Sequence, residues 1–374
     1  MKHVLMIGPY PMPGHPINGG VERVVDTLAR ALSKSLKVTL VVPGSPSDLR
    51  CDTGDFQVVY LKRSPLPASL AYWSVDALRL RRIVNELRPD IVHIQGAAGY
   101  GLCLGGPMVL TAHGIPHLDS AYLRAGRFAW FASLRARLIA AVERLGRLRA
   151  GNVVVINDYV TGALPDVRSL RHRLIPNPLD RKSLEVPVTN ERPAAIRLLA
   201  VGKVCRRKNT LGVLQLFAAA AKRLPQATLS LCGATPEADY LEECRRFVED
   251  NGLSARVRFL GALSTGQLIA EYDRSSLLVL LSNQETAPMV ICEAQARGLP
   301  VAAAPAFGIG TMVTHLANGF HLTGTDLEAN AELLVQAANH RFDGAAIRSQ
   351  ARADYDPITV AAKTVAFYRE VLHA

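Results

Sequence analysis

Short apolar runs alternate with amphipathic segments along the first half of the chain. The runs occupy residues 4–7, 38–42, 58–61, 91–94, 108–110 and 153–156. Residues 21–32 place valine and leucine at helical spacing with charged residues off that face, and residues 75–87 form a second amphipathic segment. Strands that alternate with helices in this way predict a parallel sheet covered by helices on both faces.

A second series of the same kind follows residues 177–193, which are rich in proline and charge and are interpreted as a linker. Strands are predicted at 197–201, 227–232, 257–260, 277–281 and 301–304, and helices near 209–223, 236–251, 266–273, 288–297 and 328–339. The predicted fold class is therefore α/β, with two doubly wound, Rossmann-like domains. A ligand that such domains share is expected in the cleft between them, beyond the carboxyl ends of the strands.

The length of 374 residues suits two domains, each with its own core. No apolar run approaches the ~20 residues needed to cross a bilayer, and the apolar part of the N-terminus is too short for a signal peptide. The six cysteines are scattered, without a CxxC pair or a spacing typical of metal ligands. These features predict a soluble, cytoplasmic protein whose thiols are incidental.

Two glutamates eight positions apart stand out in the second half. Glu285 follows the predicted strand 277–281, and Glu293 falls within the next helix, whose first position is expected to be Pro288. A helix N-terminus at a strand end offers N–H groups and a positive dipole end to an anion, while a carboxylate accepts hydrogen bonds from sugar hydroxyls. A nucleotide-sugar presents both an anionic phosphate and sugar hydroxyls. Taken alone, a solvated loop glutamate and an ordinary helical glutamate explain the pattern as well as a binding site does.

Four cations follow the first strand of the second domain. Gly202 comes directly after that strand, and Lys203, Arg206, Arg207 and Lys208 come next. At least one of them is expected to reach the mouth of the cleft and neutralise a leaving diphosphate. The chain lacks an Asp-x-Asp sequence, the usual short site for a divalent ion on a nucleotide-sugar, so no metal is predicted. A solvated basic turn is the alternative interpretation.

The first domain adds further candidate contacts. Gly19 and Gly20 precede the first helix, where the lack of side chains lets the backbone approach a phosphate or sugar closely. His113 follows the run 108–110, where its imidazole could hydrogen-bond a substrate hydroxyl. An ordinary glycine turn and a structural histidine are the simpler interpretations. His93 lies within a strand run and is interpreted as a satisfied core or rim histidine.

The net charge of +11 arises mostly in residues 1–180. Residues 121–150 carry arginines interleaved with aromatic and leucine side chains, and Glu143 is the only acid among them. An anionic membrane surface is the favoured partner over nucleic acid, since each basic residue near such a surface contributes ~1 kcal/mol. A solvated helix face over core aromatics would give the same pattern. The membrane or acceptor candidates are Arg124, Arg127, Trp130 and Arg135.

Several short sequences occur in an order that resembles the GT-B retaining glycosyltransferases of family 4, which include bacterial polysaccharide and glycolipid transferases. They are the Gly-Gly loop, Thr-Ala-His-Gly at 111–114, Ile-Pro-Asn-Pro-Leu-Asp at 175–180, Val-Gly-Lys at 201–203, and Glu-x7-Glu at 285–293. The resemblance covers nearly the whole chain. It implies an acceptor-binding domain at 1–178, a linker at 179–194, a nucleotide-sugar-binding domain at 195–355, and a helix at 356–374 that crosses back to the first domain.

The resemblance also implies roles for the candidate residues of the second domain. Glu293 would bind the donor ribose, and Glu285 would contact the transferred sugar together with N–H groups near Ala287, Pro288 and Met289. Lys203 and Lys208, beside Gly202, would hold the diphosphate. In the first domain, the Gly-Gly loop would approach the donor phosphate or the acceptor, and His113 would touch the sugar near the reacting carbon. No cofactor is implied, because the nucleoside-diphosphate-sugar is itself a substrate.

Two positions depart from the family pattern. Lys203 stands where arginine is usual, and it keeps the charge but loses the bidentate fork. Residues 306–311 replace the usual Gly-Gly-x-x-Glu and lack its acid, so no donor contact is carried over to this loop.

The predicted function is transfer of a sugar from a nucleoside-diphosphate-sugar to a glycan or lipid-linked acceptor, with retention of anomeric configuration and without metal. A GT-B type nucleotide-sugar epimerase shares the cleft but not the acceptor, and a non-catalytic basic binding protein is a third hypothesis. The cations after Gly202 and the Glu-x7-Glu spacing favour transfer, and no motif for nucleic-acid recognition is visible. The sequence does not specify the donor base and sugar, the acceptor or the oligomeric state.

Overall fold

The computed structural model describes residues 1–17, 19–66, 75–115, 129–188 and 195–373, with residues 129–135 described by their backbone alone. The chain forms two compact units. Unit 1 comprises Met1–Asp180 and Tyr355–Ala374, and unit 2 comprises Arg181–Asp354. Unit 2 is therefore an uninterrupted segment, whereas unit 1 is assembled from both ends of the chain.

Unit 1 is built on an eight-stranded sheet in the part of the chain that the structure describes, with strand order β3-β4-β2-β1-β5-β6-β7-β8. Neighbouring strands are parallel except β3 and β4, which are antiparallel. The central strands are buried and mostly apolar because helices cover both faces, with His93, Gln95 and Thr111 among the buried polar exceptions. The strands are β1 (His3–Ile7), β2 (Lys37–Ser45), β3 (Leu49–Asp52), β4 (Gln57–Lys62), β5 (Ile91–Gln95), β6 (Met108–Ala112), β7 (Asn152–Val155) and β8 (Arg171–Leu174).

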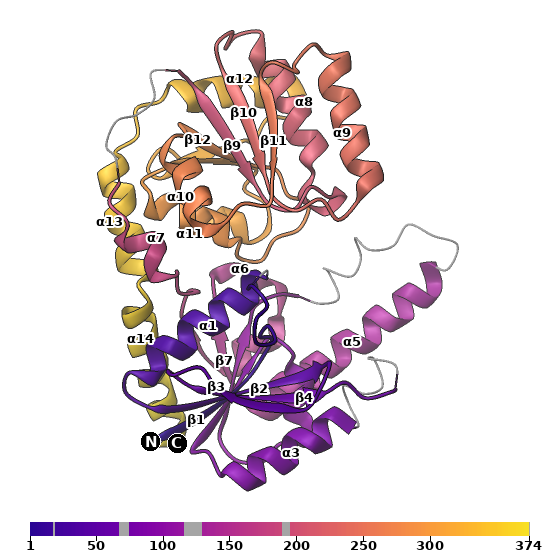
Figure 1. Ribbon diagram of the computed structural model, residues 1–374, viewed down its shortest axis with the longest axis vertical. Coiled ribbons are helices and arrows are strands. Elements are labelled where there is room, and N and C mark those ends of the chain that lie inside the picture. The colour runs from indigo at the N-terminus through magenta and orange to yellow at the C-terminus, as the bar shows by residue number, and fades with distance from the viewer. Residues whose placement is uncertain (18, 67–74, 116–128, 189–194, 374) are drawn as a thin grey trace. The chain divides into compact units, whose positions relative to one another are not determined.

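The final helix of the chain belongs to the core of unit 1. Phe367 and Tyr368 of this helix, α14, are fully buried in the cluster that also holds Val4 and Leu28. Figure 1 shows α14 packed beside α1, although the two helices lie at opposite ends of the sequence. The helices of unit 1 are α1 (Gly20–Ser33), α3 (Val75–Leu87), η1 (Ala98–Cys103), α5 (Ala129–Ala150), α6 (Asp158–Ala163), η3 (Pro165–Ser169) and α14 (Pro357–Leu372).

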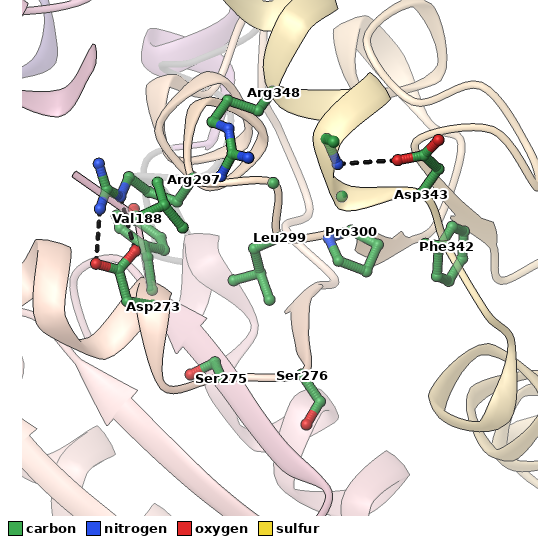
Figure 2. A pocket seen from close by; sticks show the side chains of 14 residues that line it. Val188, Asp273, Ser275, Ser276, Arg297, Leu299, Pro300, Phe342, Asp343 and Arg348 are labelled. Carbon is green, nitrogen blue, oxygen red and sulfur yellow. Dashed lines mark hydrogen bonds and ion pairs between the residues drawn. The ribbon is translucent and has the colours of Figure 1, made fainter. Parts of the chain in front are cut away.

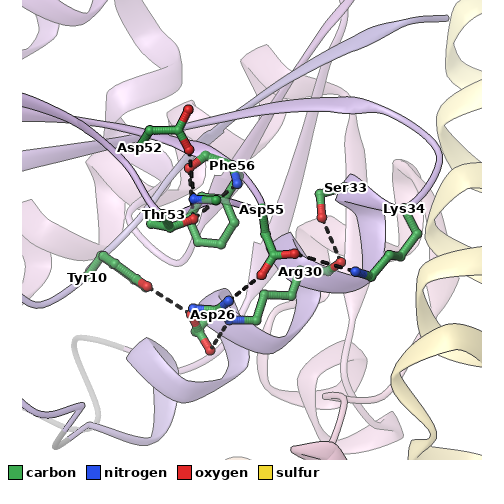
Figure 3. A network of polar contacts seen from close by, with 10 residues as sticks. Tyr10, Asp26, Arg30, Ser33, Lys34, Asp52, Thr53, Asp55 and Phe56 are labelled. Carbon is green, nitrogen blue, oxygen red and sulfur yellow. Dashed lines mark hydrogen bonds and ion pairs between the residues drawn. The ribbon is translucent and has the colours of Figure 1, made fainter.

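A polar network holds α1 against the loop after β1 and the turn between β3 and β4 (Figure 3). The Tyr10 hydroxyl donates to Asp26 at 2.9 Å, and Arg30 donates to the same carboxylate at 3.0 and 3.1 Å. Arg30 also reaches Asp55 at 2.5 Å. Burial raises the pKa of Tyr10 to about 12, and the neighbouring Asp26 adds to that shift. The network fixes the direction of α1, whose N-terminus carries the predicted glycines.

Unit 2 contains a six-stranded parallel sheet within the described residues, with strand order β11-β10-β9-β12-β13-β14. The strands are β9 (Arg197–Val201), β10 (Thr228–Cys232), β11 (Val257–Gly261), β12 (Leu277–Leu280), β13 (Val301–Ala303) and β14 (Gly319–His321). Its helices are α7 (Arg181–Glu185), η4 (Arg206–Lys208), α8 (Thr210–Ala221), α9 (Ala238–Asp250), α10 (Thr265–Asp273), α11 (Met289–Ala296), η5 (Phe307–Thr311), α12 (Leu327–Asn339) and α13 (Gly344–Tyr355). Two buried clusters pack on its two faces.

The structure corrects some of the sequence predictions. The segment interpreted as an irregular linker begins with helix α7. Pro288 is the N-cap of α11 and not its first residue, because its ψ of 113° is extended. Strands β3, β8 and β14 and helix α13 were not predicted, since the two strands β3 and β8 are largely exposed and β14 spans only three residues.

Candidate functional site

The strand order of unit 2 reverses between β9 and β12, and this reversal is where doubly wound sheets bind ligands. Gly202 and Lys203 follow β9 directly, and residues 282–285 follow β12 after one residue. The cations and the first acid predicted from the sequence therefore lie at neighbouring strand ends. Gly202 has φ +152°, a conformation that a side chain would strain, and so lets the chain turn away from the sheet here.

Several hydrogen bonds join the loop after β9 to the loop after β12. Asn209 adopts the left-handed conformation at φ 53° and donates from its side chain to Leu281 O at 3.2 Å. Arg207 Nη1 donates to Gln284 O at 2.9 Å. Asn283 returns two bonds, from its backbone N to Arg207 O at 3.0 Å and from Nδ2 to Arg206 O at 3.0 Å. These contacts hold the η4 turn against the segment that carries Glu285.

The Lys208 ammonium group donates directly to Glu285 Oε1. Both side chains are largely buried, with 16% and 9% of their surface exposed. Arg207 Nη1 lies 3.9 Å from the second carboxylate oxygen. The Glu285 backbone carbonyl accepts from Gly308 N at 3.2 Å, which ties the loop after β13 to the same point. A cation and an acid from adjacent loops thus meet at the strand-end edge of the sheet.

Glu293 lies in α11, the helix that follows the loop carrying Glu285, and it is buried, with 5% of its surface exposed. Its Oε2 accepts a hydrogen bond from the Tyr272 hydroxyl of α10 at 2.8 Å. Helix α11, which carries Glu293, begins at Met289, and its N-cap Pro288 supplies no capping side chain. The sequence placed Glu285 in a loop and Glu293 in a helix, and the structure shows both placements.

Lys203 is exposed beside a small cavity that is also lined by Gly202 and Lys208. The turn after β10 packs against Gly202. A Cβ atom on Gly233 would come within 1.9 Å of Gly202 O, so only glycine fits there. Close backbone packing behind Gly202 therefore helps fix the position of the loop that carries Lys203.

In unit 1 the strand order reverses between β1 and β5. Gly8 follows β1, and a Cβ atom there would come 2.9 Å from the Cβ of Gln95, the last residue of β5. Gly19 is the N-cap of α1, and its N–H donates to Glu22 Oε2 at 3.1 Å. Gly20 is exposed, with no atom within 4 Å of the place a Cβ would occupy.

His113 follows β6 and contacts the end of β5. Its Nε2 lies 2.6 Å from Gln95 Oε1. Burial lowers the pKa of His113 to about 4, and the neighbouring Asn177 side chain opposes part of that shift. His93 is buried with hydroxyl partners on both ring nitrogens, as expected for a core histidine. Burial lowers its pKa to about 3, and the nearby His113 adds to the shift.

The basic segment is only partly described. Arg124 and Arg127 lie outside the described residues, and Trp130 and Arg135 belong to α5, whose first turns are described by backbone alone. Further along α5, Arg147 forms a buried ion pair with Asp166 at 2.7 Å, so this arginine serves the fold. Glu143 also points inward and accepts from Ala98 N at 3.0 Å. Within the described residues, no helix is both long and apolar enough to cross a membrane.

A larger cavity of about 360 Å³ lies at the opposite edge of the unit 2 sheet, beside the residues that precede β12 and β13. Figure 2 shows Arg297 forming a two-pronged ion pair with Asp273 at its rim, at 2.7 Å for both contacts. Arg297 also donates to the backbone carbonyls of Val186 at 2.6 Å and Pro187 at 3.0 Å. None of the predicted site residues lines this cavity. The larger cavity of unit 2 therefore does not coincide with the predicted site.

Sequence reasoning missed Gln95 and Tyr272, whose side chains contact predicted site residues, and Asn209, whose side chain joins the loops after β9 and β12. Asn209 sits in a basic stretch, Tyr272 in an amphipathic helix, and Gln95 at the end of a strand run. Only Gln95 carried a usable signal, since a polar side chain that closes a buried strand at the sheet reversal is placed to face a ligand. The hydrogen-bond partners of Tyr272 and Asn209 are determined by the tertiary fold, so the sequence carried no signal for them.

Two family models match adjacent parts of the chain. The model described as glycosyltransferase family 4 matches residues 18–183, and the model described as glycosyl transferases group 1 matches residues 184–354. The boundary between the two matches falls three residues from the point where the chain enters unit 2.

Individual proteins show the same likeness. A sulfoquinovosyl transferase of Arabidopsis thaliana is 24% identical over 278 residues, which cover 69% of this chain and 50% of that protein. The chain thus matches only half the length of that relative. A GDP-mannose-dependent alpha-(1-6)-phosphatidylinositol monomannoside mannosyltransferase of Mycobacterium tuberculosis is 28% identical over 333 residues, with 82% of each protein covered.

Among solved structures, sucrose-phosphate synthase from Thermosynechococcus elongatus has the same fold, with a TM-score of 0.80, 21% identity and 100% of both chains covered. The two Rossmann-like units and the cation–acid cluster at the strand ends of unit 2 agree with the family matches. The chain therefore belongs to the GT-B glycosyltransferases of family 4.

Proposed function

We propose that the protein transfers a sugar from a nucleoside-diphosphate-sugar to a hydroxyl group of a glycan or lipid-linked acceptor, with retention of anomeric configuration and without a metal ion. The observation that carries this proposal is the Lys208–Glu285 contact at the strand-order reversal of unit 2. This contact supports the proposal because it joins the lysine that we assign to the diphosphate and the acid that we assign to the transferred sugar.

The diphosphate is held by charge and by backbone donors. Lys208 turns from Glu285 to the phosphate when the donor enters, Lys203 approaches from the exposed side, and Arg207 keeps the acid in place. The N-terminus of α11, at Met289, adds its dipole and N–H groups. These groups stabilise the charge that develops on the leaving nucleoside diphosphate, which is the task a divalent ion performs in other transferases.

The two acids grip the two sugars of the donor. Glu285 accepts hydrogen bonds from hydroxyls of the transferred sugar, and Glu293 accepts them from the ribose. Tyr272 fixes the Glu293 carboxylate from behind, because its hydroxyl holds Oε2 at 2.8 Å. Charged hydrogen bonds of this kind contribute roughly 1.5–3 kcal/mol each.

The reaction proceeds on one face of the donor. The acceptor oxygen forms a bond to the anomeric carbon as the bond from that carbon to the diphosphate oxygen breaks. The departing phosphate oxygen takes the proton of the acceptor hydroxyl, and the products are the glycoside and the nucleoside diphosphate. No separate catalytic base is required, so Glu285 and Glu293 bind the donor and do not act as the acid and base of a hydrolase.

The acceptor is assigned to a membrane surface because of the exposed face of α5. Arg137 and Arg144 lie on this face together with Leu138, Leu145 and Leu148, which are 54%, 54% and 40% exposed. Arginine interleaved with exposed leucine suits an anionic leaflet, where the charges meet headgroups and the leucines enter the boundary. The enzyme then works at the cytoplasmic face of the membrane on an acceptor that is lipid-linked or close to it.

The proposal is tested with a thermal-shift panel of UDP-, GDP-, ADP- and dTDP-sugars in the presence of a chelator, followed by transfer assays with the stabilising donor. We expect one donor class to raise Tm despite the chelator, and Glu285→Gln to lower transfer about tenfold or more, as one charged hydrogen bond implies. Glu271→Gln is the matched control, since Glu271 and Glu285 are both 8% exposed as whole residues but Glu271 of α10 pairs with Arg274, the C-cap of that helix. Unchanged transfer in the Glu285 variant, or conversion of the donor without an acceptor, contradicts the proposal.

A further inference from the structure

Gln95 closes β5 at the strand-order reversal of unit 1, and its side chain lies between two imidazole rings. It is 3% exposed. Its Oε1 lies 2.6 Å from His113 Nε2, and its Nε2 lies 3.2 and 3.1 Å from the two ring nitrogens of His93. Gly8 leaves room for this side chain, because a Cβ atom at position 8 would come too close to the Cβ atom of Gln95.

His93 determines which way the Gln95 amide faces. The ring of His93 is held in its own plane by Thr111 Oγ1 at 2.7 Å and by the Tyr368 hydroxyl at 2.5 Å. Nearly equal distances to both ring nitrogens put the amide group over the face of this ring, since an in-plane bond would approach one nitrogen. The face of an aromatic ring is negative and attracts N–H groups rather than oxygen. The NH2 group therefore faces His93, and Oε1 faces His113.

The orientation of the amide decides where His113 carries its proton. A carboxamide oxygen only accepts hydrogen bonds, so the short contact requires a proton on His113 Nε2. In a neutral ring the other nitrogen, Nδ1, then bears a lone pair. Nδ1 is buried, and no described residue forms a hydrogen bond to it. A buried acceptor that has no hydrogen-bond partner among the described residues calls for a donor from a ligand.

We infer that Gln95 is a positioning residue that holds His113 in the Nε2–H tautomer, so that Nδ1 accepts a hydrogen bond from a hydroxyl of the sugar substrate. The identity of that hydroxyl rests on the proposed function, whereas the tautomer does not. The chain of contacts runs from Tyr368 of α14 through His93 and Gln95 to His113. The final helix thereby supports the orientation of a site residue.

The tautomer can be observed without any assay of transfer. Long-range 15N–1H correlation spectra of histidine-labelled protein at pH 7.5 separate protonated from unprotonated ring nitrogens, and His113→Gln identifies the His113 signals. We expect wild type to show a proton on Nε2 and none on Nδ1, and Gln95→Met to show a mixture of tautomers. A proton on Nδ1 in wild type, or an unchanged pattern in Gln95→Met, overturns the inference.

Kinetics provide a second readout. Gln95→Met should lower kcat/KM on the order of tenfold, the effect of about one hydrogen bond. Gln95→Glu keeps an acceptor opposite Nε2, so it should restore activity at pH 8. Its negative charge favours the imidazolium and raises the pKa of His113 from about 4 towards its ordinary value. Activity of this variant should then fall between pH 7 and 5, where that of wild type is constant, because a protonated Nδ1 no longer accepts.

The other titratable groups that contact this network among the described residues are His93 and Tyr368. The spectra distinguish protonation of His93 from that of His113. Thr364→Val in α14 is the matched control, since Thr364 is 1% exposed and bonds only within its helix. An equal loss of activity in this control, or a flat pH profile in Gln95→Glu, contradicts the positioning role. Absence of transfer by wild type with every donor would instead contradict the proposed function and leave the spectra to decide.

Discussion

Each of the two acids in Glu-x7-Glu is held by a different side chain. Glu285 contacts Lys208, a partner that a ligand phosphate can draw away, whereas Glu293 contacts Tyr272, a neutral partner that can remain in place. The tyrosine hydroxyl donates to one oxygen of the carboxylate and so orients the whole group. Because it fixes the acid without neutralising it, Tyr272 should matter for nucleotide binding although it lies outside the recognised sequence pattern.

Tyr272→Phe should weaken nucleoside diphosphate binding about fivefold, since it removes one hydrogen bond of roughly 1 kcal/mol from a buried carboxylate. Isothermal titration calorimetry measures the change. Tyr240→Phe is the matched control, because its hydroxyl is similarly buried in unit 2 but accepts from Leu211 N at 2.9 Å. Equal affinity in wild type and Tyr272→Phe would show that Glu293 is oriented by other contacts.

At this scale the sequence predicted the charged residues but not their partners. Glu285, Glu293 and the lysines follow strand ends in the sequence, so the carboxyl edge of a parallel sheet gathers them. The Lys208–Glu285 contact depends on Asn209 adopting a left-handed turn, which only the folded loop shows. Gln95 reads as one polar residue at the end of an apolar run, and its role depends on the rings on either side.

At the level of secondary structure, the apparent linker is held to unit 2 by one buried arginine. Arg297 follows α11, has 1% of its side chain exposed, and joins Asp273 to the backbone of residues 186 and 187. Arg352 of α13 also donates to the Leu184 carbonyl. The start of the linker, including α7, is therefore part of unit 2 and not a free connection.

Arg297→Met should lower the free energy of unfolding by about 3 kcal/mol, because it leaves Asp273 largely buried without its partner. Urea denaturation measures the change. The control is Arg223→Met, whose ion pairs with Glu328 and Glu332 are exposed and whose loss should cost less than ~1 kcal/mol. A similar small effect for both variants would mean that the linker is not held by Arg297.

The central strands and the long amphipathic helices were predictable because their apolar periodicity is strong. Strands β3 and β8 were not predictable, because they are largely exposed and produce no buried run. Helix α7 has five residues and lies beside prolines, and its position is set by Arg297 from a distant part of the sequence. Local sequence patterns do not predict an element whose position is determined by tertiary contacts.

For the molecule as a whole, the uneven charge bears on where the enzyme works. The net charge of +11 is concentrated in unit 1, and α5 presents arginine and leucine together on an exposed face. Only part of the basic segment contributes to this face, because Arg147 is buried in an ion pair. The exposed basic face is thus narrower than the arginine content indicates, and its role at a membrane stays a prediction.

The protein should be retained on vesicles that contain anionic lipid and not on neutral vesicles, with retention falling as salt screens the charges. Replacing both Arg137 and Arg144 by Gln should weaken retention roughly tenfold or more, since each contributes ~1 kcal/mol. The control replaces Arg81 and Arg82, two exposed arginines of α3, and removes the same charge elsewhere on unit 1. Equal loss in the two double variants would assign the attraction to net charge and not to α5.

The return of the chain into unit 1 has a consequence for the order of folding. Leu179 N, just before the chain enters unit 2, donates to Tyr355 O, just after it returns, at 2.9 Å. Unit 2 is continuous and can fold as soon as residue 354 has left the ribosome. Unit 1 has its sheet by residue 174 but lacks Phe367 and Tyr368, so its core stays open while unit 2 is made. The first half of the chain is thus completed last, after the half that follows it.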